Sequence, residues 1–421
     1  MARARTTTTK TTKTSSIPTP ESRKRRSRRL VELNERESKR QQLEKEPPSF
    51  SFGVIADIQY ANIPDGHSYA GVPRYYRNSA KAARNAAQHF EKEKVPIVLN
   101  LGDIVDGKCQ ELIKYGGDPL PEGADAGLVA VDDVMEALTP YQSGPILHTY
   151  GNHELYNLDR TTLGKRLGIA FVKEANGDLV GYRSLSMNGI RFVVLDTYDI
   201  NILRRCPNES SKHQKAVEYL STHNPNFPEQ ENSPQGLNGL KKRFVAFNGA
   251  VDEPQLEWLR TTLEEARQAG EKVVVLSHQP ILPGSASPMC IVWNYNDVLD
   301  VLREYGDIIM VSFAGHAHKG GYKRDPYSGI HFRVIEAVLE NPSPNDTYGL
   351  VDMYSDRMVV RGYGNCTSSV YDLSHVGGFA TKQPLSTASK TEAETETKTK
   401  TKTDTTTTTT AAAAAAGDNV A

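Results

Sequence analysis

Five apolar runs, each ending abruptly in a polar cluster, constrain the fold of this chain more than any other feature. Each run has the length and composition of a buried β-strand. In chain order the runs are 52–56, 95–101, 146–150, 273–276 and 308–314. In open α/β sheets, ligands bind in the crevice beyond the carboxyl ends of the strands. The pattern therefore predicts that five strands bring their polar residues to one edge of the structure.

The residues that follow these runs are of the types that bind metal ions. In chain order they are Asp57, Gln59, Asp103, Asp106, Asn152, His153, His278, His316 and His318. Carboxylate, amide and imidazole groups are oxygen and nitrogen ligands that suit Mn, Fe or Zn, in contrast to the cysteine ligands of a soft thiolate site. Taken alone, Gly102-Asp103 is also typical of a strand followed by a turn. The ordered set instead predicts a metal centre, and Asp103, in the middle of the order, can bridge two ions.

These clusters form five ordered motifs: Asp-x-Gln, Gly-Asp-x-x-Asp, Gly-Asn-His-Glu, Ser-His and Gly-His-x-His. The set resembles the calcineurin-like metallophosphoesterases, whose usual first motif is Asp-x-His, so Gln59 departs from the pattern. The stretches 52–61, 74–79 and 290–295 are similar to the manganese-dependent ADP-ribose/CDP-alcohol diphosphatase group within that family. The resemblance covers roughly residues 49–373.

The resemblance implies a fold and a set of metal ligands. The fold would be α/β, a four-layer αββα sandwich of two mixed β-sheets flanked by helices. Asp57, Gln59 and His318 would hold the first ion, Asn152, His278 and His316 the second, and Asp103 would bridge them. Two divalent ions are therefore expected. Mn²⁺ is favoured because Gln59 offers an oxygen ligand, with Fe, Zn or Mg as alternatives.

The resemblance also implies roles around the ions. His153 would face the substrate phosphate and stabilise charge or protonate the leaving group, and Asp106 would be the carboxylate that orients it. Asp106 alone could equally cap a helix or turn. Tyr69, Phe247 and Cys290 would form a nucleoside-binding wall, although each could instead be a loop anchor packed on the domain.

The expected function is hydrolysis of the diphosphate in small nucleoside diphosphate conjugates, such as ADP-ribose or CDP-alcohols, by two-metal activation of water. One alternative is a phosphomonoesterase or a cyclic nucleotide phosphodiesterase with the same chemistry. Another is a non-catalytic binding scaffold, whose expected signature is the loss of ligands. Here the only departure from the motifs is Gln59.

Composition limits the domain organisation and the partners. Residues 1–48 are Thr-, Arg- and Lys-rich and residues 374–421 are low in complexity, so we expect disordered tails around one domain, 49–373. The net charge of −1 offers no strong case for nucleic acid. Four cysteines without C-x-x-C spacing favour free thiols and a reducing compartment. We expect a cytoplasmic monomer without a membrane span, and the basic run 24–29 could direct nuclear import.

Periodicity places the main elements between the motifs. Helices are expected at 76–93, 126–138, 252–269 and 294–304. Asn188-Gly189 is the residue pair that a type I′ hairpin turn prefers, and it predicts a hairpin formed by 181–186 and 191–196. Residues 198–250 read as an irregular insertion, and loops of that length inside a domain are more often functional than idle.

Overall fold

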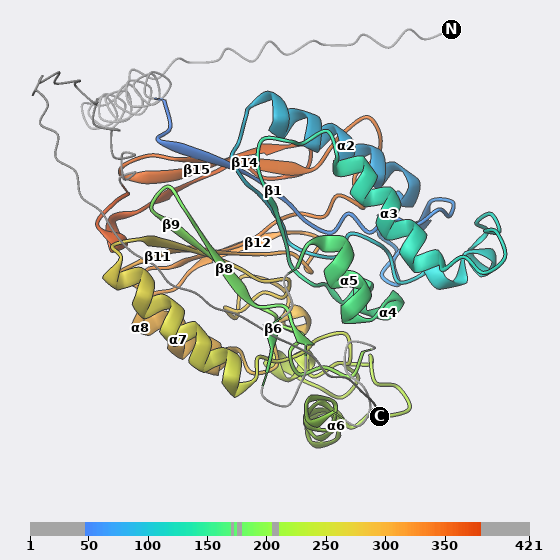
Figure 1. Ribbon diagram of the computed structural model, residues 1–421. Helices are drawn as coiled ribbons and strands as arrows, with labels where there is room; N and C mark the ends of the chain where they lie inside the picture. Colours follow the sequence, from blue (N-terminus) through green and yellow to red (C-terminus); the bar gives the residue numbers. More distant parts are fainter. Residues whose placement is uncertain (1–46, 170–171, 175–178, 204–209, 380–421) are drawn as a thin grey trace, which may run out of the picture. The chain divides into compact units, whose positions relative to one another are not determined.

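Two six-stranded β-sheets lie at the centre of the computed structural model (Figure 1). Sheet 1 has the strand order β16-β15-β14-β1-β4-β5, and sheet 2 has the order β12-β13-β11-β10-β9-β8. Sheet 1 contains β1 (Phe50–Ile55), β4 (Val98–Asn100), β5 (Ile146–His148), β14 (Tyr348–Met353), β15 (Arg357–Tyr363) and β16 (Ser369–Asp372). Sheet 2 contains β8 (Arg183–Met187), β9 (Ile190–Val194), β10 (Lys272–Leu276), β11 (Ile309–Ala314), β12 (Gly321–Arg324) and β13 (His331–Val334). Both sheets are mixed: β1, β4 and β5 run parallel, as do β9, β10, β11 and β13, whereas the remaining pairs are antiparallel.

The structure describes residues 47–379, apart from 170–171, 175–178 and 204–209. The predicted tails therefore lie almost entirely outside the described residues, as does Cys206, while Cys109, Cys290 and Cys366 are free thiols. The domain limits at 49 and 373 stay predictions. Val376 and Phe379 lie beyond the second limit and are buried in the apolar layer between the sheets.

The two sheets face each other across that apolar layer. Phe52 of β1 packs edge-on against Phe192 of β9, with ring centroids 5.6 Å apart, and against Phe313 of β11 at 6.2 Å. Ile55 of β1 instead belongs to the cluster under the helices of sheet 1. The strands are thus buried on both faces, which explains why they appear in the sequence as continuous apolar runs.

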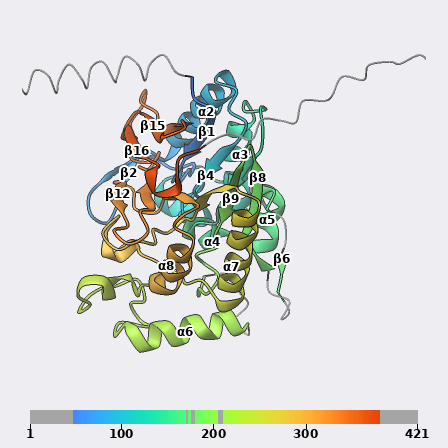
Figure 2. The ribbon, with the colours of Figure 1, turned by 90° about the vertical axis from the view of Figure 1, so that its left-hand side faces the viewer.

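Helices cover the outer face of each sheet (Figures 1 and 2). Sheet 1 is covered by α2 (Tyr76–Lys92) and α3 (Ala126–Leu138), and sheet 2 by α7 (Glu253–Gln268) and α8 (Tyr295–Glu304). The alanine stripe of α2 and Phe90 are buried against sheet 1, as their helical spacing predicts. Asp252 caps α7 by accepting a hydrogen bond from the Glu253 amide. The predicted αββα sandwich of two mixed sheets is confirmed.

The segment 198–250 differs from its prediction. It contains α6 (Ser211–His223) and a 3₁₀ helix, Gly239–Arg243, so the expectation of an irregular insertion was wrong there. Leu220 of α6 packs with Phe244 and Trp293 in a small apolar cluster of its own. Figure 2 shows α6 beyond the ends of α7 and α8.

Several shorter elements were also not predicted. They are β2 (Gly66–His67), β3 (Pro73–Arg74), α4 (Asn152–Asn157), α5 (Arg160–Leu167), β6 (Val172–Lys173), β7 (Leu179–Val180) and three 3₁₀ turns, Cys109–Glu111, Ile113–Tyr115 and Pro288–Cys290, with a fourth at Ser374–Val376. The predicted hairpin is confirmed, because β8 and β9 pair antiparallel. Asn188 and Gly189 in its turn both have positive φ, 51° and 80°, as a type I′ turn requires. Among the described residues, no helix is long and apolar enough to cross a bilayer.

Candidate metal centre

The predicted metal ligands stand just beyond the carboxyl ends of strands from both sheets. From sheet 1, Asp57 and Gln59 follow β1, Asp103 follows β4, and Asn152 begins α4 after β5. From sheet 2, His278 follows β10, and His316 and His318 follow β11. Each strand is anchored by its ladder, so these side chains are carried on rigid elements.

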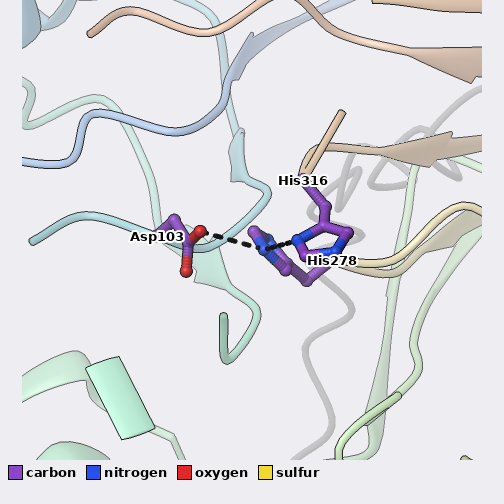
Figure 3. Close-up of side chains that lie close together, drawn as sticks. All are labelled: Asp103, His278 and His316. Carbon is purple, nitrogen blue, oxygen red and sulfur yellow. Dashed lines mark hydrogen bonds and ion pairs between the residues drawn. The ribbon is translucent and has the colours of Figure 1, made fainter. Parts of the chain in front are cut away.

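Asp103, His278 and His316 point toward one another (Figure 3). The Nε2 atom of His278 lies 3.2 Å from Oδ2 of Asp103 and 3.2 Å from Nδ1 of His316. One ligand atom from each residue falls within 4.8 Å of the other two. The structure therefore assembles a carboxylate from sheet 1 with two imidazoles from sheet 2.

A second group of ligands adjoins the first through Asp103. The Nε2 atom of His318 lies 3.6 Å from Oδ1 of Asp57. The side-chain nitrogen of Gln59 lies 2.9 Å from Nε2 of His318 and 3.1 Å from Oδ2 of Asp103. Asp103 thus contacts both groups, as a bridging ligand must. Gln59 presents its nitrogen here, so the predicted ligation through its carbonyl oxygen would require the amide to turn over.

Hydrogen bonds fix which nitrogen two of the histidines present. Nδ1 of His278 lies 2.6 Å from the Leu101 carbonyl oxygen, and Nδ1 of His318 lies 2.8 Å from Oε1 of Glu340. A carbonyl or an ionised carboxylate can only accept, so each Nδ1 carries the proton. In both rings it is therefore Nε2 that faces the cluster, the arrangement found in metal-binding histidines. This donor set fits divalent ions.

Burial and mutual proximity shift the protonation of these groups. Burial raises the pKa of Asp57 to about 6, although His318 and His278 act to lower it. Burial would also raise the pKa of Asp103, but the imidazoles of His278 and His153 outweigh it and hold that pKa well below its usual range. Burial likewise opposes charge on His278, yet Asp103 raises its pKa to about 9. A divalent ion must therefore displace a proton shared by this pair.

His153 stands next to the cluster with its protonation pattern also fixed. Its Nδ1 accepts the Gly107 backbone N–H at 2.7 Å, so in the neutral ring the proton is on Nε2, which lies 3.9 Å from Oδ2 of Asp103. Burial lowers the pKa of His153, although Asp103 and Asp106 oppose the shift. Asp106 lies 3.6 Å from Nδ1, but the hydrogen bond at that nitrogen comes from Gly107. The orienting role of Asp106 stays a prediction.

A cavity of about 550 Å³ opens over the cluster. Its walls include Gln59, Asp103, Asn152, His153, His316 and His318, together with Phe247 and Cys290. Tyr69, the third residue predicted for the nucleoside wall, is fully exposed and is not among the lining residues. The structure thus brings two of those three residues to the site.

Several residues of the site had not been predicted individually. Arg74, Lys319 and Glu340 line the cavity, and Asn248 contacts His316 behind it. Arg74 falls in the stretch 74–79 that carries part of the family resemblance, but no function was assigned to it from the sequence. Asn248 and Glu340 lie in segments with no metal-ligand spacing, and only the folded structure brings them to the ligands.

Comparisons with known proteins agree with this geometry. Residues 50–320 match the family model described as calcineurin-like phosphoesterase. Two curated relatives are both named manganese-dependent ADP-ribose/CDP-alcohol diphosphatase. The one from Oryza sativa is 39% identical over 316 residues, covering 75% of this chain and 91% of the relative. The one from Homo sapiens is 35% identical over 328 residues, covering 75% and 90%. A crystal structure titled a dimetal phosphatase from Danio rerio superposes with a TM-score of 0.69 at 35% identity, covering 77% of this chain and 99% of that one.

A two-sheet sandwich that gathers carboxylate, amide and imidazole ligands at its strand ends defines the chain as a member of the calcineurin-like phosphoesterase family. Within that family, the chain belongs to the group formed by the manganese-dependent ADP-ribose/CDP-alcohol diphosphatases. The resemblance drawn from the sequence motifs is confirmed.

Proposed function

We propose that this protein hydrolyses the diphosphate bond of small nucleoside diphosphate conjugates with the help of two divalent ions, Mn²⁺ being preferred. ADP-ribose would give AMP and ribose 5-phosphate, and CDP-choline or CDP-glycerol would give CMP and the phosphoalcohol. The observation that carries the proposal is the cavity, which is lined by candidate metal ligands together with Phe247 and Arg74. The names of relatives up to 39% identical support it.

The bound ions would supply the chemistry that acts on the reacting phosphate. Two divalent ions lower the pKa of a water molecule and neutralise charge on the attacking and leaving oxygens. Asp57, Gln59 and His318 would hold one, Asn152, His278 and His316 the other, and Asp103 both. His278 and His318 both turn Nε2 toward the cluster, so their rings suit this task without rearrangement once His278 has lost the proton that it shares with Asp103.

The chain itself would bind the rest of the substrate and stabilise charge on it. His153 presents an Nε2–H from a neutral ring, so it can donate a hydrogen bond to the leaving oxygen as charge develops there, a contribution worth about 10²–10³ in rate. Phe247 offers an apolar face in the cavity, and stacking a base on an aromatic ring contributes about 1–3 kcal/mol. The cavity, about 550 Å³, falls in the range of small-molecule sites.

Arg74 favours a diphosphate over a monoester as the substrate. Its guanidinium lies 3.5 Å from Oδ2 of Asp106 and 3.4 Å from the Gln59 side-chain oxygen, both long contacts, and its buried Nε has no hydrogen-bond partner among the described residues. A guanidinium held this loosely can donate hydrogen bonds to the second phosphate group of a diphosphate. A monoester would leave the guanidinium with only its long contacts to Asp106 and Gln59.

A substrate panel assayed with Mn²⁺ and with Mg²⁺ tests the proposal. The panel contains ADP-ribose, CDP-choline, CDP-glycerol, AMP and a cyclic nucleotide, and the products are separated by ion-exchange chromatography. We expect AMP or CMP from the conjugates with Mn²⁺. Free inorganic phosphate would indicate the phosphomonoesterase alternative, and turnover of the cyclic nucleotide alone would indicate a phosphodiesterase.

Asp103→Ala is the matched inactive control for that panel. Because Asp103 contacts both ligand groups, its loss should abolish turnover and lower the metal content from two ions per chain toward none. Elemental analysis of the purified variant measures the metal. Two retained ions in Asp103→Ala, or no turnover of any conjugate by the wild type, would contradict the proposal.

A further inference from the structure

We propose that Asn248 is a positioning residue whose side-chain amide fixes the nitrogen that His316 presents to the metal centre. Asn248 is fully buried and belongs to neither sheet. The inference rests on the proposed metal site, although not on any particular substrate.

The orientation of the Asn248 amide follows from its two donor contacts. Its side-chain nitrogen donates to the Arg243 carbonyl oxygen at 2.8 Å and to the Met289 carbonyl oxygen at 2.7 Å. Carbonyl oxygens only accept, so both hydrogens of the amide are committed and the nitrogen cannot exchange places with the oxygen. The side-chain oxygen therefore faces His316, whose Nε2 lies 2.9 Å away.

An accepting oxygen at that distance determines the tautomer of His316. The Nε2 atom must carry the proton to make the hydrogen bond, and a neutral imidazole has only one proton to place. Nδ1 is left with a free electron pair, and it lies 3.2 Å from Nε2 of His278. His316 therefore presents Nδ1, whereas His278 and His318 present Nε2. The buried amide of Asn248 thus fixes the protonated nitrogen of His316, as the Leu101 carbonyl and the Glu340 carboxylate do for His278 and His318.

The same amide joins two segments that line the cavity. Asn248 directly follows Phe247, and Met289 directly precedes Cys290; Phe247, Met289 and Cys290 all line the cavity. The hydrogen bond from Asn248 to the Met289 carbonyl oxygen holds these two segments together behind the wall. One side chain thus sets the direction of a metal ligand and the spacing of the wall beside it.

Two substitutions separate the acceptor role of Asn248 from its donor role. Asn248→Leu has a similar volume and removes all three side-chain hydrogen bonds, whereas Asn248→Asp keeps an acceptor for His316 and loses both donors. Outer partners of metal ligands are typically worth about 10–100-fold in metal affinity. We expect Asn248→Leu to weaken one of two Mn²⁺ sites by about that factor, and Asn248→Asp to keep both sites near wild-type affinity. Isothermal titration with Mn²⁺ alone, in the absence of substrate, measures this.

Asn201→Ala is the matched control, because Asn201 is an equally buried amide in the same segment. Its side chain donates to the Asn248 carbonyl oxygen at 2.7 Å and accepts the Leu203 amide at 2.6 Å, so its hydrogen bonds go to the main chain. We expect it to lower the melting temperature without changing Mn²⁺ affinity. Equal loss of Mn²⁺ affinity in Asn248→Asp and Asn248→Leu would overturn the proposal.

A measurement on the wild-type protein decides the case even if a variant does not fold. In metal-free protein labelled with ¹⁵N-histidine, we expect the His316 ring to show its proton on Nε2, with the signal assigned by its loss in His316→Gln. A proton on Nδ1 would overturn the proposal. Neither this spectrum nor the titration depends on turnover, so a wrong substrate assignment would not affect the result.

Discussion

At the scale of single residues, four of the proposed metal ligands have a left-handed backbone conformation that residues other than glycine rarely adopt. Asp57, Gln59, Asp103 and His316 have φ values of 52°, 44°, 54° and 65°. Each such residue costs about 1–3 kcal/mol and persists only where its surroundings hold it. The Asp103 amide donates to the buried Glu154 carboxylate at 3.1 Å, and the His316 amide donates to Asp57 at 3.0 Å. The directions of these ligands are thus set by the main chain as well as by their rotamers.

His153→Ala should separate a substrate-facing role from a metal-binding role. If the Nε2–H of His153 donates to the leaving oxygen as proposed, turnover should fall by about 10²–10³. Substrate affinity and both ions should be retained. Single-turnover kinetics and elemental analysis measure the two quantities. Asp106→Asn should cost less, since the hydrogen bond that orients the ring comes from Gly107. Loss of an ion from His153→Ala would show that this ring is a metal ligand.

The order of the motifs predicted which residues gather at the site, and it did so for a physical reason. Polar residues that end neighbouring parallel strands converge at one edge, which accounts for Asp57 beside Asp103 in sheet 1 and for His278 beside His316 in sheet 2. That the two sheets would bring Asp103, His278 and His316 together followed from the family resemblance of the ordered motifs. Glu340 and Asn248 could not be placed in this way, because they reach His318 and His316 only through tertiary contacts across 22 and 68 residues. The exposed position of Tyr69 likewise depends on the path of a loop that has no periodicity.

At the scale of helices and strands, prediction succeeded where periodicity and capping agreed. The ends of α3 match those predicted, and Asp125 caps it by accepting the Leu128 amide. The missed helix α6 shows the opposite case. Its buried face contains Ala216 and Leu220 but also Lys212, so the pattern along the sequence looks polar where the structure is buried. The edge strands β12 and β16 are four residues each, too short to show an alternation.

Lys212→Met should destabilise the protein through the carboxylates that it leaves behind. The fully buried ammonium of Lys212 lies 2.5 Å from Asp199, 2.9 Å from Glu174 and 3.5 Å from Asp252. Removing one partner of a buried charge cluster typically costs about 3–5 kcal/mol. Urea denaturation at neutral pH measures the free energy of unfolding.

Lys215→Met provides the matched control for that measurement. Lys215 is on the same helix and binds the same Asp252 at 2.7 Å, but 47% of its side chain is exposed. Exposed ion pairs contribute about 0–1 kcal/mol, so this variant should stay close to the wild type. Equal stabilities of the two variants would show that the buried cluster does not hold α6 in place.

At the scale of the whole molecule, the position at which the C-terminal truncation is made should decide its effect. A chain ending at residue 373 loses Val376 and Phe379, which are buried between the sheets, whereas a chain ending at 382 keeps both. Loss of one buried aromatic side chain alone costs about 3–5 kcal/mol. We expect the first truncation to lower the melting temperature by several degrees or more, and the second to leave it near that of the full chain.

Differential scanning calorimetry of both truncated proteins and the full chain makes this comparison. If both truncated proteins had the melting temperature of the full chain, burial of Phe379 between the sheets would contribute nothing to stability. If both melted early, residues after 382 would contribute to the stability of the described unit.

The proposed ligands come from both sheets, so each bound ion would also cross-link the two sheets. Asp57, Asp103 and Asn152 are carried by sheet 1, while His278, His316 and His318 are carried by sheet 2. Each ion would draw ligands from both, and any ligand that binds only the folded state adds its binding free energy to stability. Hydrogen exchange in the strand ends around the cavity would then follow the free Mn²⁺ concentration. At low Mn²⁺ concentration we therefore expect more frequent local opening between the sheets as well as slower turnover.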